Sequence, residues 1–318
     1  MSIATNYQEE LNGLRSAIAE VFIGQPELVE GSLCALLAGG HVLIEGVPGL
    51  GKTLLVRSLG QLLGCDFSRI QFTPDLMPSD ITGSHIYNLK EQKFQFMRGP
   101  VFTNLLLADE INRSPAKTHS ALLEIMQETQ VTIDNRTYPI EKPFFVMATQ
   151  NPVESEGTYN LPEAALDRFL LKLMIYYPAE AEELDILRLH STGDGSERIK
   201  EIKSVLSKKA ILEIGQQVDQ ITVSEGVLHY INKLVRVTRS HQDIYLGCSP
   251  RAGLALMKTA RARALLENRD FVIPDDIKAL TPAAFRHRIV LTPEAEVEGR
   301  QIDDVIQAVI AEVPVPDR

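Results

Sequence analysis

Apolar residues follow two different patterns in the two halves of the chain. Between residues 41 and 178, short apolar runs alternate with segments that repeat an apolar residue every three or four positions. Continuous apolar runs predict strands covered on both faces, as in a parallel sheet, and the segments between them predict helices. The runs occupy residues 41–45, 67–72, 104–109, 144–149 and 169–177. We therefore expect an α/β fold here.

Two segments inside this region alternate apolar and polar residues instead. Residues 84–99 alternate on either side of the polar run KEQK, and residues 131–141 do so around Asp134 and Asn135. Alternation around a short polar turn is typical of a β-hairpin. We expect two hairpins inserted into the α/β core.

The pattern becomes helical after Pro178. From about residue 207 onward one amphipathic segment follows another to about residue 289. We place a domain boundary near residues 178–181. The predicted domains are an α/β nucleotide-binding domain of residues 1–179 and an all-α domain of residues 180–318.

Composition narrows the classes of function. The 318 residues carry a net charge of −10, which disfavours a broad nucleic-acid surface, because lysine and arginine supply most of the affinity for phosphates. The three cysteines lie far apart without a C-x-x-C motif, so a reducing compartment fits. No apolar stretch is long enough to span a bilayer, and the N-terminus does not resemble a signal peptide. We expect a cytoplasmic protein without membrane insertion.

The strongest motif is the stretch GVPGLGKT at residues 46–53, which fits the phosphate-loop pattern G-x-x-x-x-G-K-[ST]. It lies between a predicted strand and a predicted helix, as that motif requires. Lys52 would reach the β- and γ-phosphates, and the Thr53 hydroxyl would bind Mg²⁺. The predicted nucleotide-binding residues of this loop are Gly46, Val47, Pro48, Gly49, Leu50, Gly51, Lys52, Thr53 and Leu54.

Two adjacent carboxylates, Asp109 and Glu110, end the apolar stretch LLLADE. Ligands of parallel α/β sheets bind at the carboxyl ends of the strands. Asp109 could therefore hold Mg²⁺, and Glu110 could orient and deprotonate an attacking water. The chain lacks the N-K-x-D motif that reads guanine, so ATP is the expected nucleotide.

Two further polar residues are candidates for contact with the γ-phosphate. Asn151 ends the next strand and could hold the attacking water, although an asparagine before Pro152 could also simply form a turn. Arg251 lies in the first turn of a helix that begins after Ser249, where its charge opposes the helix dipole. If the helical domain covers the nucleotide, Arg251 could meet the γ-phosphate; otherwise it is solvated or paired to an acid.

These motifs, in this order, resemble the AAA+ ATPases. The stretches DEINRSPAKTHSALLEIMQE and ATQNPVESEGTYNLPEAALDRF resemble more specifically the MoxR family of bacterial AAA+ proteins. The resemblance extends from about residue 20 to about residue 290. It implies a parallel five-stranded sheet in the order 5-1-4-3-2, two β-hairpin inserts and an all-α lid domain. It also matches Asn151 to sensor 1 and Arg251 to sensor 2.

The resemblance assigns two further sets of residues. Phe22, Ile23 and Gly24 belong to a segment that lies against adenine in the family. Arg168 matches the arginine finger, which reaches the γ-phosphate of the neighbouring subunit; the alternative is a salt bridge to Asp167 or Glu163. Arg113 could also face a subunit interface, or it could be an ordinary surface residue.

Three functions remain open from the sequence. The first is an ATP-hydrolysing, Mg²⁺-dependent ring, implied to be hexameric, that remodels partner proteins and could work with a von Willebrand factor A protein. The second is a nucleic-acid motor of the MCM type, which the few basic residues of the hairpins disfavour. The third is a regulatory scaffold that binds ATP without needing hydrolysis, which a complete catalytic set disfavours.

Overall fold

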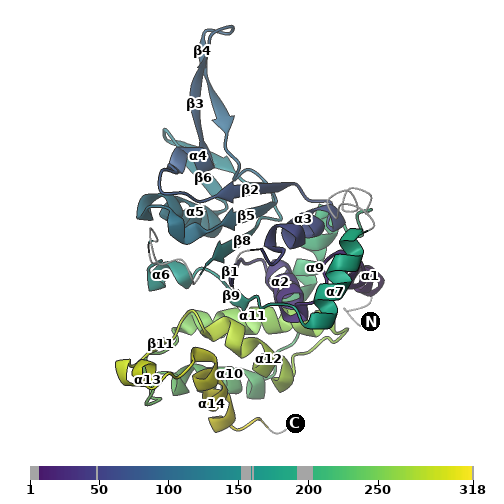
Figure 1. Cartoon of the computed structure of the whole chain (residues 1–318), viewed down its shortest axis with the longest axis vertical. Helices are drawn as coiled ribbons and strands as arrows, with labels where there is room; N and C mark the ends of the chain where they lie inside the picture. The colour runs from purple at the N-terminus through teal and green to yellow at the C-terminus, as the bar shows by residue number, and fades with distance from the viewer. Residues whose placement is uncertain (1–6, 48, 152–158, 160, 192–202, 317–318) are drawn as a thin grey trace.

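A parallel five-stranded sheet forms the centre of the α/β part of the molecule (Figure 1). The computed structural model describes residues 7–47, 49–151, 159, 161–191 and 203–316. The strands of the sheet are β1 (Val42–Glu45), β2 (Phe67–Gln71), β5 (Leu105–Asp109), β8 (Phe145–Gln150) and β9 (Leu171–Met174). Their order is β2-β5-β8-β1-β9, and every pair is parallel. Counted along the chain, this is the predicted order 5-1-4-3-2.

The sheet separates two apolar layers, which explains why its strands are continuously apolar. Alternate residues of each strand point to opposite faces. In β1, for example, Val42 and Ile44 join one core cluster and Leu43 joins the other. The first cluster includes residues of α1 (Gln8–Val21), α2 (Pro26–Leu37) and α3 (Lys52–Leu62), and the second includes residues of α5 (Ala116–Glu128).

Both predicted hairpins are present. The first consists of β3 (Gly83–Asn88) and β4 (Lys93–Arg98), follows α4 (Pro78–Thr82), and extends away from the body at the top of Figure 1. The second consists of β6 (Gln130–Ile133) and β7 (Arg136–Pro139). The two hairpins are in contact through the rings of Phe96 and Tyr138, which stack with centroids 4.3 Å apart, and through His85 and Asp134 at 3.0 Å.

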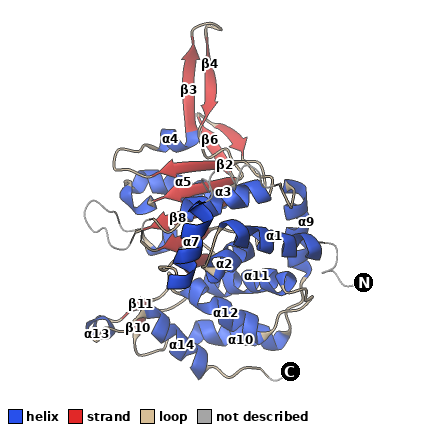
Figure 2. Cartoon of the chain, turned by 45° about the vertical axis from the view of Figure 1, so that its right-hand side comes forward, coloured by secondary structure: helices blue, strands red, loops and turns tan. Residues whose placement is uncertain are grey.

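The C-terminal part is helical, as expected, and its segment from residue 225 onward lies below the sheet in Figures 1 and 2. Its helices are α7 (Glu180–Ser191), α9 (Lys208–Gln220), α10 (Glu225–Val237), α11 (Pro250–Leu266), α12 (Pro274–Phe285), α13 (Pro293–Val297) and α14 (Ile302–Glu312). A short antiparallel pair, β10 (Ile244–Leu246) with β11 (Val290–Leu291), accompanies them and was not predicted. The domain boundary near residues 178–181 stays a prediction. Across the described residues, none of the helices has the length and apolarity that a bilayer crossing would need.

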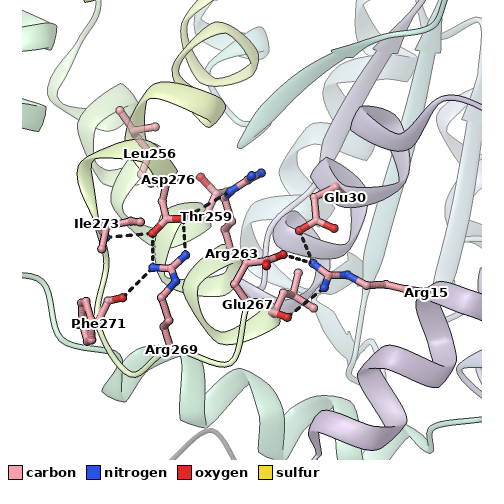
Figure 3. Close-up of polar contacts among 11 residues, drawn as sticks. Arg15, Glu30, Leu256, Thr259, Arg263, Glu267, Arg269, Phe271, Ile273 and Asp276 are labelled. Carbon is pink, nitrogen blue, oxygen red and sulfur yellow. Dashed lines mark hydrogen bonds and ion pairs between the residues drawn. The ribbon is translucent and has the colours of Figure 1, made fainter.

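Polar contacts join the first helix of the chain to the lid (Figure 3). Arg15 of α1 donates to Glu30 of α2 at 2.6 Å, to the carboxylate of Glu267 at 2.9 Å and to the carbonyl of Leu266 at 3.1 Å. Leu266 ends α11, so the guanidinium lies at the negative end of that helix dipole, where a cation is stabilising.

A second polar group in Figure 3 fixes the start of α12. The Asp276 side chain is only 3% exposed and accepts two bonds from Arg269, at 2.6 and 2.8 Å. It also accepts from the backbone N–H of Ile273, which precedes the helix. This carboxylate therefore combines a buried ion pair with a helix cap.

We predict that Asp276→Ala lowers the free energy of unfolding by about 3 kcal/mol, because it leaves the Arg269 charge half-buried without its partner. The neighbouring Asp275, which is 81% exposed in its side chain, is the matched control, and Asp275→Ala should change stability by less than about 0.5 kcal/mol. Urea unfolding of both variants measures the difference. Equal effects would mean that the Asp276 pair adds nothing beyond a surface charge.

Candidate functional site

The phosphate-loop sequence forms a turn between β1 and α3 that requires glycine. Gly46, Gly49 and Gly51 have φ angles of 155°, 87° and 77°, which favour a residue without a side chain. A Cβ at Gly46 would lie 2.3 Å from Cγ2 of Ile175 and 2.5 Å from its carbonyl oxygen. Pro48 lies outside the described residues. The loop therefore brings its backbone close to β9 and presents the first turn of α3.

Lys52 begins α3 and points back into this loop. Its ammonium donates to the carbonyl of Gly46 at 2.7 Å. Burial lowers the pKa of Lys52, and the carboxylates of Asp109, Glu110 and Glu45 oppose that shift. A bound phosphate would favour the charged form in the same way, since a nearby anion stabilises an ammonium ion.

The two predicted acids at the end of β5 are held by different partners. Asp109 accepts from the hydroxyl of Thr149 at 2.6 Å and from Arg69 at 2.7 Å. Glu110 accepts from the amide of Gln71 at 2.7 Å and from Arg113 at 2.9 Å. Each of the two acids is thus held by two side chains of the same chain.

The backbone of Glu110 is left-handed, with φ 56° and ψ 50°. Its N–H donates to the hydroxyl of Thr149 at 2.8 Å, and the same hydroxyl donates to Asp109. Non-glycine residues in this conformation are uncommon and concentrate at functional sites. Thr149 therefore fixes both acids through one hydroxyl group.

The sequence reasoning missed three residues of this site: Arg69, Gln71 and Thr149. Arg69 and Gln71 had been treated as ordinary positions of a strand. Arg69 and Gln71 are long polar residues close to the carboxyl end of the strand β2. Because ligands bind at that end of the strands in a parallel sheet, their position is the signal that could have identified them. The parallel pairing of Gln71 with Asp109 brings them to the acids.

These groups surround a cavity of about 260 Å³, named here the Lys52 cavity. Its lining residues are Gly49, Gly51, Lys52, Thr53, Arg69, Gln71, Asp109, Glu110, Thr149 and Asn151. The structure therefore brings Lys52, Thr53, the two acids and the buried Asn151 together. A helix N-terminus and an ammonium group suit phosphate, and the oxygen atoms of Thr53 and Asp109 suit Mg²⁺. The residues present fit a magnesium nucleotide.

The segment expected to contact adenine lies beside the phosphate loop. A Cβ at Gly51 would lie 3.2 Å from the ring of Phe22, so this ring is next to the loop. Gln25 fixes the segment by donating to the carbonyl of Tyr176 at 2.6 Å. Gly24 has φ 76° and approaches the carboxylate of Glu182 in α7. The contact of this segment with adenine stays a prediction.

Arg168 and Arg251 lie together at a second cavity, of about 280 Å³, named here the Arg168 cavity. Arg168 follows the short helix α6 (Glu163–Leu166), and Arg251 lies in the first turn of α11. Lys258 and Arg288 line the same cavity, with Asp167 as its acid. The sequence analysis expected that Arg251 could meet the γ-phosphate if the helical domain covers the nucleotide, and this stays a prediction. In the structure Arg251 lines the same cavity as Arg168 and is not among the residues lining the Lys52 cavity.

The alternative partners named for these arginines can now be compared. Asp167 accepts from Arg288 at 2.6 Å through one oxygen and from the Ser249 hydroxyl at 3.3 Å through the other. Arg251 approaches the second oxygen at 4.0 Å, a distance typical of a weak ion pair. Among the described residues, the ion pairs of Asp167 are thus with Arg288 and Arg251, and the role of Arg168 stays a prediction.

Comparison with known proteins gives matches over nearly the whole chain. Residues 41–171 match the ATPase family associated with various cellular activities (AAA), and residues 236–309 match the AAA lid domain. The chain is 49% identical to the uncharacterized protein YeaC of Bacillus subtilis, over 98% of this chain and 97% of that protein. It is 44% identical to the chaperone MoxR1 of Mycobacterium tuberculosis, over 96% of this chain and 83% of that protein. A crystal structure of a candidate ATPase from Cytophaga hutchinsonii has a TM-score of 0.91 at 41% identity, covering 99% of this chain and 97% of that one.

We predict that Glu110→Gln keeps nucleotide affinity within about threefold but lowers ATP hydrolysis by about 10²- to 10⁴-fold, because an amide cannot take a proton from water. Lys52→Ala should instead weaken nucleotide binding, because the loop loses its ammonium. A fluorescent ATP analogue measures affinity, and phosphate release measures hydrolysis. Near-normal hydrolysis by Glu110→Gln would exclude Glu110 as the general base.

Proposed function

Because this chain belongs to the MoxR family of AAA+ ATPases, we propose that it hydrolyses ATP as a hexameric ring with each nucleotide between two subunits. The ATP phosphates would lie in the Lys52 cavity of one subunit. The Arg168 cavity of the next subunit would face them. Hydrolysis would drive the remodelling of a partner protein, a chaperone-like role.

The observation that carries this proposal is the separation of the cations into two cavities. Lys52, at the phosphate loop, shares its cavity with Asp109 and Glu110. The Arg168 cavity contains four basic side chains and one acid. Asp167 pairs with the buried Arg288, which leaves the cavity with an excess of positive charge that suits a multiply charged anion presented from outside. The γ-phosphate of a neighbouring subunit has that chemistry.

Within the nucleotide site, the side chains have separate tasks. Thr53 and Asp109 would hold Mg²⁺, which when bound neutralises charge on the phosphate oxygens. Glu110 would accept the proton of the attacking water, whose position Asn151 would help to fix. Gln71 and Arg113 donate hydrogen bonds to the Glu110 carboxylate, so these bonds would have to weaken before Glu110 takes a proton from water.

Arg168 and Arg251 would act on the phosphate from across the subunit interface. Arginine is always charged and its planar group matches phosphate oxygens, so it stabilises the charge that develops during transfer. We extend this role to Arg251 because it lines the same cavity as Arg168. The nucleotide would then contact both parts of the next subunit, since Arg251 belongs to the lid and Arg168 to the α/β part.

The first hairpin favours a protein partner over a nucleic acid. Tyr87, Leu89 and Phe94 are all exposed near its tip, with Leu89 83% exposed. Lys93 is paired with Glu91 at 2.6 Å, which removes one of the few cations available for phosphates. Exposed apolar side chains on a projecting element are typical of a protein contact. The partner, including a von Willebrand factor A protein, remains part of the proposal.

We predict that Arg168→Ala and Glu110→Gln are each nearly inactive alone, with Arg168→Ala reduced by about 10³-fold or more, but recover ATP hydrolysis when mixed. In a mixed ring, the intact nucleotide site of an Arg168→Ala subunit can meet the intact finger of a Glu110→Gln subunit. Phosphate release over a range of mixing ratios measures this recovery.

Each variant mixed with wild type serves as the control for exchange between rings. If both variants assemble and exchange but their mixture stays inactive, Arg168 does not act between subunits. Salt-sensitive stimulation of hydrolysis by DNA would instead support the nucleic-acid motor.

A further inference from the structure

Arg288 follows α12 and holds the backbone on both sides of Arg168. Its guanidinium donates to the Asp167 carboxylate at 2.6 Å, to the carbonyl of Phe169 at 2.6 Å and to the carbonyl of Leu170 at 3.1 Å. The Arg288 side chain is only 3% exposed, so it does not itself present its charge to solvent. One lid side chain therefore fixes the turn that carries the proposed finger.

The two residues before Arg288 strengthen the same junction. His287 contacts the carbonyl of Phe169 at 3.1 Å, and Arg286 donates to the carbonyl of Lys172 at 2.9 Å. Arg286 is itself held by Asp303 of α14 through two bonds, at 2.9 and 3.0 Å. Three consecutive lid residues thus contact the segment that leads from the Arg168 turn into β9.

The second oxygen of Asp167 faces the start of α11. It accepts from the Ser249 hydroxyl at 3.3 Å and lies 4.0 Å from the guanidinium of Arg251. Ser249 is also the N-cap of α11, the helix that carries Arg251. Asp167, which lies in the turn that carries Arg168, therefore joins Arg288, three residues beyond the end of α12, to the start of α11.

Because the Arg288 guanidinium is buried, it needs a carboxylate partner. Desolvation lowers the pKa of Arg288, and the hydrogen bond and charge of Asp167 oppose that shift. A buried guanidinium without a carboxylate would be strongly unfavourable. The other guanidinium N–H groups donate to the backbone carbonyls of Asp167, Phe169, Leu170 and Ala284, so the pair is held in one geometry.

We propose that Asp167 and Arg288 are positioning residues that hold Arg168 and Arg251 as one rigid unit facing the neighbouring nucleotide. This inference rests on the proposed action of Arg168 between subunits. In this proposal neither Asp167 nor Arg288 contacts the phosphate. They couple the turn that carries Arg168 to the lid, so that Arg168 and Arg251 reach the phosphate together.

The first test is Arg288→Lys, which keeps the charge but cannot make the set of fork-shaped bonds. We expect kcat to fall by about 10- to 100-fold with KM for ATP nearly unchanged. The variant subunit keeps its own nucleotide site, and only the Arg168 that it presents to its neighbour is displaced. Arg300→Lys is the matched control, since Arg300 pairs with Asp243 at 3.6 Å elsewhere in the lid, and it should retain full activity. Unchanged kcat in Arg288→Lys would overturn the inference.

A mixing experiment locates the defect in the subunit that donates the finger. Arg288→Lys mixed with Glu110→Gln should recover hydrolysis, because the second variant supplies a well-positioned finger. Arg168→Ala mixed with the double variant Glu110→Gln/Arg288→Lys should recover at least about tenfold less than Arg168→Ala mixed with Glu110→Gln alone. Equal recovery in these two mixtures would overturn the positioning role.

Asp167→Asn keeps the side-chain size and tests the pair from its other member. We expect the same fall in kcat and the same pattern in the mixtures. Thermal unfolding and ring assembly of each variant identify those that remain folded, and if Arg288→Lys unfolds, Asp167→Asn gives the answer. Failure of the Arg168→Ala and Glu110→Gln mixture would reject the proposed function itself. Success of that mixture with full activity in Asp167→Asn would reject only this inference.

Discussion

The hydroxyl group of Thr149 controls the geometry on which the proposed nucleotide site depends. It donates to Asp109 and accepts from the backbone of Glu110, whose left-handed conformation would otherwise be unfavourable by about 1–3 kcal/mol. The parallel register that sets Ala108 of β5 opposite Ala148 of β8 brings Thr149 to this point. The two acids are therefore positioned by the sheet and not by a mobile loop, and the strain at Glu110 is stabilised by the most buried part of the fold.

The parts of this site that could be predicted from sequence are those fixed by local chemistry. The phosphate loop needs glycines, a lysine and a hydroxyl within eight positions, and Gly46 shows why, because any side chain there would meet Ile175. The strands could be predicted because a sheet covered on both faces needs continuous apolar runs. The order of the strands came from the family resemblance, since local patterns do not specify which strands become neighbours.

The parts that could not be predicted depend on contacts between distant segments. Gln71 reaches Glu110 only because β2 pairs with β5, and no periodicity of β2 reveals that pairing. The pairing of β10 with β11 likewise joins segments more than forty residues apart. Arg251 was recognised as unusual because its charge opposes its helix dipole, but the sequence could not specify its environment. Its neighbours Asp167 and Arg288 come from two other segments of the chain.

The pair formed by Arg288 and Asp167 is better explained by geometry than by stability. Replacing a buried ion pair with apolar side chains is often neutral or stabilising, so such a pair alone is weak evidence of a contribution to the free energy of unfolding. An apolar contact, however, would allow the turn around Arg168 to slide against the lid, because packing forces have little direction. Hydrogen bonds from one guanidinium to a carboxylate and four backbone carbonyls define both distance and orientation. In the proposed ring, Arg168 would need that definition to meet a phosphate on another subunit, because an error of about 1 Å can lower the rate by about 10²-fold.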